Sequence, residues 1–386
     1  MSLLTRKRTI LAKIESVYGT DPTPTGAANA ILIKNINITP METNLVDRDN
    51  IKAYLGNNPQ VLAAVYVKVD FEVELAGSGT AGSAPAWGPL MRACGFSETT
   101  LGTAHTGTAQ AGATNTITLA NTASASDNAY QGMTINTTGG TGSGQSAVIQ
   151  SYNGTTKVAT LTANWTTPPD ATTAYSIPKQ VVYLPISTGF ESNTIYFNQD
   201  GVLHKLLGAR GTVSINLPLY GIPSFKFMFT GLYVTPSDSA VPTVTLTGFQ
   251  APLAINNANT SGLNILGYSG AVLSDFSFDV ANNVVFRSLP GGQENVLITQ
   301  RKPVGKITQE ATTVASKDWW GAVKNVMTGI FSILHGTTAG NKVKIDAPSI
   351  QLTKPTYADK DGVAMLQTDV NFIPVVGNDE ISISVQ

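Results

Sequence analysis

Cysteine and histidine are scarce in this chain. Its 386 residues include one cysteine, Cys94, and three histidines, His105, His204 and His335. A single cysteine excludes an intrachain disulfide framework and fits folding in a reducing compartment. Zinc sites need several cysteine or histidine ligands at short spacings, and these four residues are far apart in the sequence. We therefore predict no metal site.

Charge and long apolar runs are scarce as well. Charged residues make up 13% of the chain and the formal net charge is −1, so no basic field exists to hold nucleic acid electrostatically. No apolar run approaches the ~18 residues of a membrane span. The N-terminal segment MSLLTRKRTILAKIES has neither the apolar core nor the cleavage site of a secretory signal. We expect the chain to be made and folded in the cytoplasm.

Catalytic motifs are also missing. No G-x-S-x-G elbow, phosphate-binding loop or dinucleotide fingerprint occurs, and the glycine run at 139–144 lies between two short strand-like segments. Asp359 and Asp361 resemble half of a calcium loop, but the other half is absent, so a hairpin turn at Asp361-Gly362 fits better. We predict that the protein is not an enzyme and needs no cofactor.

What the chain does have is a long alternating segment, 61–75. Apolar residues at its odd positions alternate with even positions that end in Lys68, Asp70, Glu72 and Glu74. Strict alternation predicts a half-buried strand, and at roughly 3.3 Å per residue it would span about 50 Å. Most strands have only about 3–10 residues. A long strand with one apolar and one mostly acidic face predicts a sheet that lines a space.

Composition divides the rest of the chain. Residues 1–30 contain the helix- and strand-breaking run YGTDPTPTGAANA, and we predict an N-terminal arm that packs on a neighbouring subunit or is disordered. Residues 103–178 are nearly uncharged, with a tight-turn signal at Asn153-Gly154. They contain the strand-like segments NTITLA, QGMTIN, SAVIQSY, KVATLTANW and AYSIP, with Trp165, Tyr130, Tyr152 and Ile149 for a core. We predict an inserted all-β domain.

The remaining residues repeat one plan. ILIKNINITP, NLVDR, the long strand and a helix-like WGPLMRACG are followed later by SDFSFDV, NVVFR, VGKITQEATTV and a helix-like DWWGAVKNVMTGIF. A proline-containing strand pair ends each copy. We predict a mainly β protein with two tandem sandwich or barrel domains, each with a flanking helix. The first comprises residues 31–102 and 179–240, and the second residues 241–386.

Both predicted helices carry an apolar stripe. Cys94 ends the stripe of the first helix, and Phe331 that of the second. Such stripes predict packing against a sheet, which makes Cys94 a buried structural thiol rather than a nucleophile. The predicted core residues are Val69, Phe71, Val73, Trp87, Leu90, Met91, Trp320, Val323 and Met327.

Several blocks of the sequence resemble a known family. YGTDPTP and FEVELAGSGTAGSAPAWGPLMRACGF are similar to the N-terminal half of the tail tube, or major tail, proteins of long-tailed bacteriophages. The segment from GNKVKIDAPSIQLTKPTYADKDGV to the C-terminus resembles the closing portion of the same family. The resemblance covers most of the chain outside residues 103–178, which look like small β-modules of phage virions. It implies a structural virion protein whose rings stack around a channel for DNA.

The resemblance also implies how copies would assemble. Members usually carry one tube domain per chain and form six-membered rings, so two domains per chain predict a homotrimer with pseudo-sixfold symmetry, with a homohexamer as second choice. DNA would pass through the lumen without sequence-specific binding, other tail proteins would bind the tube ends, and residues 103–178 would project outward. The predicted channel-lining residues are Lys68, Asp70, Glu72, Glu74, Lys306, Thr308 and Glu310.

Two alternatives belong to other functional classes. A minor tail or surface module would recognise host glycans through the inserted domain. A β-rich hydrolase would use Asp70, Glu72 and Glu74, whose neighbours on one strand face stand about 7 Å apart, a separation of the order seen in glycosidases. No cluster of sugar-stacking aromatic residues surrounds these carboxylates in the sequence, so a solvated strand face is the better interpretation.

Overall fold

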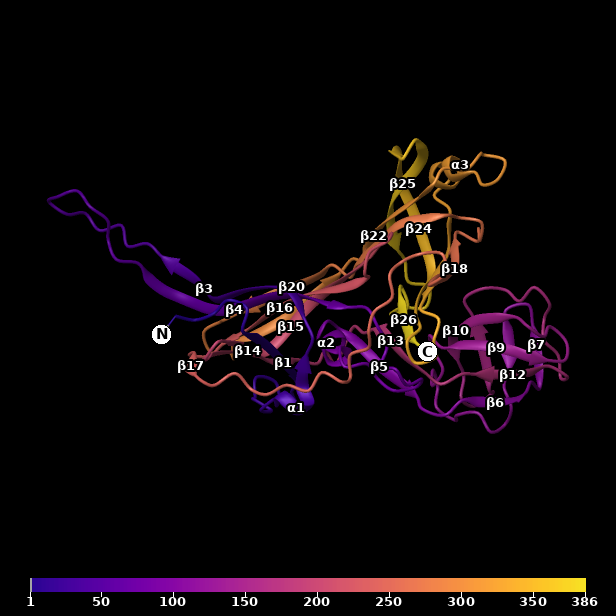
Figure 1. Cartoon of the computed structure of the whole chain (residues 1–386), viewed down its shortest axis with the longest axis horizontal. Helices are drawn as coiled ribbons and strands as arrows, with labels where there is room; N and C mark the ends of the chain where they lie inside the picture. Colours follow the sequence, from indigo (N-terminus) through magenta and orange to yellow (C-terminus); the bar gives the residue numbers. More distant parts are fainter. Residues whose placement is uncertain (1) are drawn as a thin grey trace.

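The computed structural model describes residues 2–386, which are built mostly of antiparallel β-strands (Figure 1). The predicted mainly β class is therefore confirmed. Helices α1 (Gly26–Asn29), α2 (Gly88–Ala93) and α3 (Trp319–Lys324) are short. Within residues 2–386, no helix has the length and apolar character needed to cross a lipid bilayer.

One series of neighbouring strands, called the first set, runs in the order β3-β4-β16-β15-β14-β1. The strand predicted over residues 61–75 is its member β4. The bounds are β1 Arg8–Ile14, β3 Lys34–Val46, β4 Val61–Glu74, β14 Asn193–Gln199, β15 Val202–Pro218 and β16 Ser224–Tyr233. Two short strands, β2 (Ala30–Ile31) and β17 (Ser237–Asp238), pair with β1 and β15.

A second set repeats this order as β19-β22-β25-β24-β23-β18. Its β22 holds the place of β4, and a short helix follows each of these two strands. The bounds are β18 Thr260–Ile265, β19 Leu273–Asp279, β22 Val304–Glu310, β23 Thr328–His335, β24 Val343–Lys360 and β25 Val363–Phe372. The two sets thus share one neighbour order.

The two sets also share an irregularity. Strands β20 (Asn282–Arg287) and β21 (Asn295–Arg301) continue the β19–β22 hairpin. The register skips Ala63 in the β3–β4 hairpin and Thr299 in β20–β21, so each hairpin carries a β-bulge. The flanking pairs are Asn44–Ala64 and Leu45–Leu62 in one hairpin, and Asn283–Gln300 and Val284–Ile298 in the other. When the two bulges are aligned, Leu62 corresponds to Ile298 and Leu45 corresponds to Val284.

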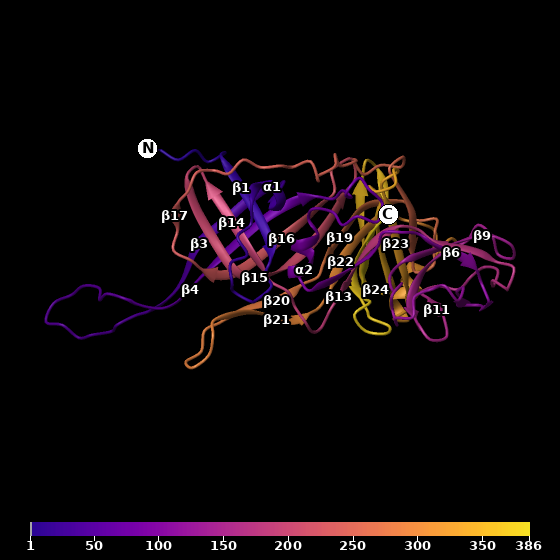
Figure 2. The same ribbon diagram turned by 90° about the horizontal axis from the view of Figure 1, so that it is seen from below.

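The sets join edge to edge. Ser214–Pro218 of β15 pair antiparallel with Asp275–Asp279 of β19. Strands β3-β4-β16-β15 therefore continue into β19-β22-β25-β24 as one sheet, seen from below in Figure 2. Alternate residues of this sheet, such as Phe71, Phe227 and Phe276, point into one large hydrophobic core. Each fully buried aromatic side chain of this kind contributes about 1.5–3 kcal/mol.

Residues 103–178 lie beside the main sheet with a sheet of their own. Its order is β6-β12-β9-β10-β11-β8-β7, and its core contains Tyr130, Ile149, Tyr152 and Trp165. The bounds are β6 His105–Thr108, β7 Ala111–Ala113, β8 Thr116–Thr118, β9 Thr134–Gly139, β10 Ser146–Tyr152, β11 Val158–Leu161 and β12 Ala174–Ile177. Strands β5 (Phe96–Leu101) and β13 (Gln180–Pro185) flank it and pair with each other, and β13 also pairs with β26 (Ser382–Val385).

The predicted arm over residues 1–30 is wrong for residues 8–14. These residues form β1, which pairs along its whole length with β14. Ile10, Leu11 and Ala12 are all buried, because one face of β1 meets the main core and the other meets a small cluster with Tyr196 and Leu203. The N-terminal segment is therefore part of the first set.

The predicted core stripe of the second helix is wrong for Trp320 and Met327. Helix α3 ends at Lys324 and β23 begins at Thr328, so the expected helical spacing does not extend to these positions. Trp319 is buried instead, whereas Trp320 is 38% and Met327 51% exposed. Val323 is partly buried against the main core. At the first helix, by contrast, Leu90 and Met91 of α2 and the flanking Trp87 and Cys94 are all buried.

Candidate channel-lining face and subunit edges

The face of the continuous sheet opposite the core is polar in both sets; we call it the open face. In β4, Lys68 is exposed and Asp70, Glu72 and Glu74 are half-buried, while the residues between them are buried. The other strands alternate in a similar way, except that Thr212 and Ser224 on this face are buried. The open face comprises Lys68, Asp70, Glu72, Glu74, Arg210, Thr212, Ser214, Asn216, Ser224, Lys226, Met228, Thr230, Asp275, Ser277, Asp279, Lys306, Thr308, Glu310, Gln367, Asp369 and Asn371.

Strand register places the predicted lining residues of both sets on this one face. Directly opposed residues of an antiparallel ladder point to the same side of the sheet. One such row of opposed residues runs Glu74, Ser224, Asn216, Ser277, Lys306 and Asp369. Lys68, Asp70, Glu72 and Glu74 are thereby brought together with Lys306, Thr308 and Glu310. The sequence pattern missed Asp275, Asp279 and Asp369, whose alternating segments SDFSFDV and LQTDVNF were the available signal.

Charges of both signs are interspersed on the open face, although carboxylates outnumber lysines. The Lys68 ammonium lies 3.5 Å from Glu42, and the Lys354 ammonium lies 3.1 Å from Asp369. Asn37 Nδ2 donates a hydrogen bond of 3.1 Å to Asp70. Exposed pairs of this kind contribute only about 0–1 kcal/mol each. Their main effect is to leave a mildly negative, hydrated surface.

The continuous sheet ends in two unpaired strand edges among residues 2–386. At one end β3 pairs with β4 alone, and its Ile36 and Ile38 are only partly buried. At the other end, β24 pairs with β25 as far as Lys360, but with β23 and β26 only over residues 343–351. The outer edge of residues 353–360 is therefore free. Open edges are templates for pairing with another chain.

The free edge of β24 corresponds to the part of β15 that joins the two sets. Counted across the ladders from Glu74 and Glu310, the last residues of β4 and β22, Tyr357 takes the place of Ile215. Ile215 is 1% exposed, yet Tyr357 is 64% exposed. Its ring packs on Trp320, with centroids 5.4 Å apart. Two large aromatic side chains are thus left partly uncovered beside an unpaired edge.

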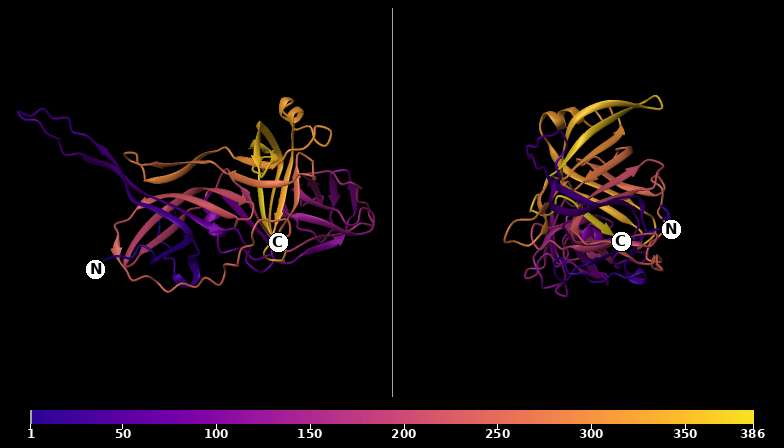
Figure 3. Two further views of the ribbon diagram at one scale, coloured as in Figure 1. Left: turned by 45° about the horizontal axis from the view of Figure 1, so that its top comes forward. Right: turned by 90° about the vertical axis from the view of Figure 1, so that its left-hand side faces the viewer.

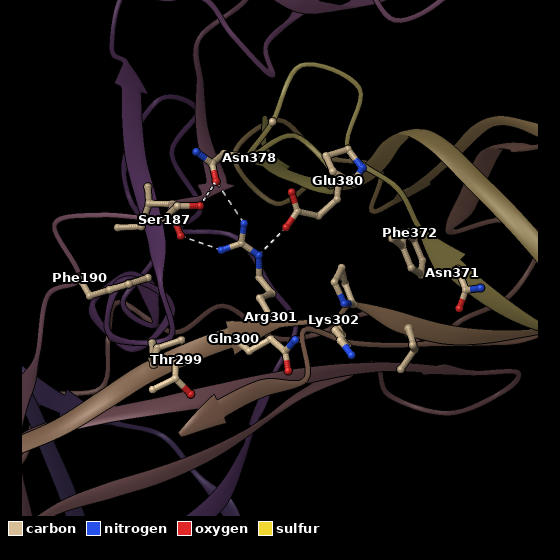
Figure 4. A pocket seen from close by; sticks show the side chains of 16 residues that line it. Ser187, Phe190, Thr299, Gln300, Arg301, Lys302, Asn371, Phe372, Asn378 and Glu380 are labelled. Carbon is tan, nitrogen blue, oxygen red and sulfur yellow. Dashed lines mark hydrogen bonds and ion pairs between the residues drawn. The ribbon is translucent and has the colours of Figure 1, made fainter. Parts of the chain in front are cut away.

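A cavity of about 770 Å³ lies where β21, β25 and two loops meet (Figure 4). Arg301 crosses it: its guanidinium forms an ion pair with Glu380 and donates to the carbonyl of Ile186 at 2.6 Å and to Asn378 at 3.2 Å. Ser187 also donates to Asn378 at 2.6 Å. Arg301 therefore joins the β13–β14 loop, β21 and the loop before β26, and its contacts serve cohesion between segments.

The ionisable groups that could support chemistry are far apart in the sequence; Cys94 and His335 are buried, and His105 and His204 are partly buried. Burial raises the pKa of the Cys94 thiol well above its usual value, which disfavours the thiolate. Burial lowers the pKa of His105, His204 and His335. In the part of the chain that the structure describes, no group of three or more histidine, cysteine or acidic side chains is placed to hold a metal ion.

Comparison with known proteins gives one finding. The family model described as phage tail tube protein matches residues 5–374. The match spans both strand sets as well as residues 103–178. A search of curated proteins finds no match.

Proposed function

The chain belongs to the phage tail tube protein family, and we propose that it self-assembles head to tail into rings that stack into the tail tube, the channel for DNA delivery into the host cell. The observation that carries this proposal is the continuous sheet with its two unpaired edges. The family is one of structural tail proteins, so the role of the chain is to build a wall rather than to catalyse a reaction.

The junction inside the chain supplies the pattern for the junction between copies. Within the chain, residues 214–218 of β15 receive β19. The corresponding free residues of β24 are 356–360, and the strand corresponding to β19 is β3. In the proposed ring, Tyr357 of one copy stands opposite Ile38 of the next, Ala358 stands opposite Asn37, and both free edges become paired. A head-to-tail contact of this kind gives a closed ring when the rotations from copy to copy add up to one full turn.

Two sets per chain favour a homotrimer with pseudo-sixfold symmetry, and a homohexamer is the second choice. In this proposal the first tube domain comprises residues 31–102 and 179–240, together with β1, and the second comprises residues 241–386. Other tail proteins bind the tube ends.

The open face lines the channel in this arrangement. DNA carries one negative charge per roughly 1.7 Å of axis, so a face richer in carboxylates than in lysines does not hold it. Repulsion is screened over about 8 Å at physiological salt. The wall therefore lets DNA slide without sequence-specific binding.

The layering of β13 supports an outward position for the inserted domain, residues 103–178. Val181 and Tyr183 of β13 belong to the main core, whereas Val182 and Leu184 belong to the core of the insert. The open face, the main core, β13 and the insert therefore follow one another in that order. If the open face lines the channel, the insert lies on the outside of the tube.

Electron microscopy of the purified protein at high concentration tests the proposal. We expect hollow rings or tubes whose end-on averages show three outer protrusions, one for each insert. Six protrusions would retain the tube but reject the trimer. A protein that stays monomeric at every salt and protein concentration tried would contradict the proposed function itself.

A further inference from the structure

Two corresponding hairpins of the chain have different surroundings. The free hairpin, residues 41–65 of β3, β4 and their loop, projects away from the body (Figure 3). The docked hairpin, β20–β21, lies against the first set (Figure 1). Ile298 of the docked hairpin is 9% exposed, whereas its counterpart Leu62 is 49% exposed. Met41, Leu45, Val46 and Val61 on the free hairpin are also about half exposed.

The docked hairpin is held at the end of α2. Gly95, in the turn that follows α2, faces Ile298 of the docked hairpin. A Cβ atom at position 95 would lie 3.5 Å from Ile298 Cδ1, which is van der Waals distance. Asn282 Nδ2 donates to the carbonyl of Cys94 at 2.7 Å and to that of Gly211 at 3.0 Å. Apolar contact and hydrogen bonds to main-chain carbonyls therefore act together at this point.

Main-chain groups of β21 complete the contact. Arg210 Nη1 donates to the carbonyl of Val296 at 2.8 Å, and the amide of Val296 donates to Tyr18 Oη at 2.6 Å. On the other strand of this hairpin, the Phe286 ring stacks on Tyr66 with centroids 4.9 Å apart. The docked hairpin is thus bound through its own backbone and through aromatic stacking, and Val296 is fully buried.

The second set has the corresponding surface, but nothing in residues 2–386 covers it. Val326 follows α3 as Gly95 follows α2, and both have a positive φ, 56° and 84°. Val326 is 63% exposed and its neighbour Met327 is 51% exposed. An apolar surface beside a helix end is therefore open in the second set at the place where the first set holds a hairpin.

We propose that the free hairpin of one copy docks on the surface at Val326 and Met327 of the preceding copy, whose β24 edge receives its β3. This inference rests on the proposed head-to-tail assembly, and the internal contact is its template. The aligned bulges place Leu62 where Ile298 lies and Leu45 where Val284 lies. The two copies involved are the same two whose β3 and β24 edges meet. One interface therefore buries the exposed apolar residues of the free hairpin together with Val326 and Met327, which would otherwise favour aggregation.

Two variants of the full chain test the inference. The hairpin variant carries Leu45→Asp and Leu62→Asp, and the surface variant carries Val326→Asp and Met327→Asp. All four side chains are about half exposed or more in the single chain, so both variants are expected to fold, which circular dichroism verifies. Each variant alone should need at least about tenfold more protein than the wild type to form rings. Val375→Asp, at a site 56% exposed in another loop, is the matched control and should assemble as the wild type does.

Mixing the variants gives the sharper result. The hairpin variant keeps its docking surface and the surface variant keeps its hairpin. In a mixture, the hairpin of the surface variant can therefore dock on the hairpin variant, whereas no other pairing of the two proteins has both parts intact. We expect sedimentation to show dimers at the protein concentration where the wild type forms rings, and few larger species. Dimers should be absent when either variant is alone at that concentration.

The outcomes separate this inference from the proposed function. If the wild type forms rings and both variants form them equally well, the docking contact is rejected while the tube remains. If the mixture yields no dimers, the hairpin and the Val326 surface are not partners, and the inference is overturned. If the wild type forms no rings, the proposed function itself fails.

Discussion

The indole nitrogen of Trp87 donates a 2.8 Å hydrogen bond to the carbonyl oxygen of Ala76, two residues beyond the end of β4. In the second set, the indole nitrogen of Trp319 donates to Thr312 Oγ1 at 2.9 Å, two residues beyond the end of β22. Each buried tryptophan thus connects a short helix to the strand that precedes it. A helix of six residues has little intrinsic stability, so these contacts hold it in place.

Replacing either tryptophan by phenylalanine should destabilise the fold. Trp87→Phe leaves the Ala76 carbonyl without its donor and opens a small void, at a cost of about 2–3 kcal/mol. Trp319→Phe should behave similarly. Denaturant unfolding measures both effects, with the partly exposed Trp320→Phe as a control expected to change stability by less than about 0.5 kcal/mol. Equal losses at Trp319 and Trp320 would contradict the assigned burial.

Glu15 should be essential for holding the N-terminal segment in place. Its carboxylate is buried and accepts hydrogen bonds of 2.6–2.8 Å from Ser192, Thr194 and the amides of Gly19 and Gly208. Glu15→Ala leaves these donors unpaired and should cost about 3 kcal/mol of unfolding free energy. The exposed Glu294→Ala is the control. A loss of less than about 0.5 kcal/mol for Glu15→Ala would support a loosely attached segment instead.

Thiol labelling in assembled tubes should locate the open face. Cysteine introduced by Glu72→Cys should react with a small maleimide in tubes, but only slowly with a maleimide on a large polymer that enters poorly from the tube ends. Dissociated subunits should react with both reagents. Thr155→Cys, exposed on the insert, should react with both reagents in either state. Native Cys94 gives little background because it is buried. Equal polymer labelling of Glu72→Cys in tubes and subunits would place this face outside the lumen.

Removing the insert should leave ring assembly intact. Leu101 and Gln180 are directly paired, so a short glycine-serine linker can replace residues 103–178. Val182 and Leu184 would become exposed and should be changed to threonine in the same variant. We expect micrographs to show tubes without outer protrusions. A folded variant that forms no rings would show that the insert contributes to contacts between copies.

Stability should fall as the pH is lowered through about 6.5, the ordinary histidine pKa. Burial lowers the pKa of His335, although its bond to the Leu253 carbonyl partly opposes this shift, and burial also lowers the pKa of His105 and His204. Below that pH the unfolded chain binds protons that the folded chain does not, so unfolding becomes easier. Urea unfolding at pH 7.5 and 5.5 measures the difference, and His335→Gln should reduce it. An unchanged difference in this variant would exclude His335 as a source.

Local signals in the sequence predicted parts of the fold well. The alternation around Phe71 specifies a strand and its buried face. The Asp361-Gly362 turn was also predicted, and both residues have positive φ, 56° and 81°, as a tight hairpin between β24 and β25 requires. Strand β1 was missed because Ile10, Leu11 and Ala12 are consecutive and all buried. A strand covered on both faces lacks alternation and resembles an irregular segment.

The elements that depend on distant pairing were beyond the reach of local patterns. Trp319 and Trp320 are adjacent, and only the actual end of α3 decides which of them faces the core. The free edge at 353–360 is invisible in the sequence, because an edge is defined by the neighbour that a strand does not have. The open face likewise required the register between β15 and β19, which are separated by a long stretch of chain.

Because one polypeptide carries two strand sets, the number of strand-set positions in a proposed ring is restricted. In the proposed assembly, each chain adds two positions to the circumference, so a closed ring has an even number of positions, and a ring of five or seven cannot form. Half of the joints of the proposed ring are made within one chain during folding, so they do not depend on protein concentration. Only the other half depends on encounter between molecules. Covalent linkage of two positions therefore excludes the ring diameters that odd numbers of positions would give. It also reduces the number of joints that can form incorrectly between molecules.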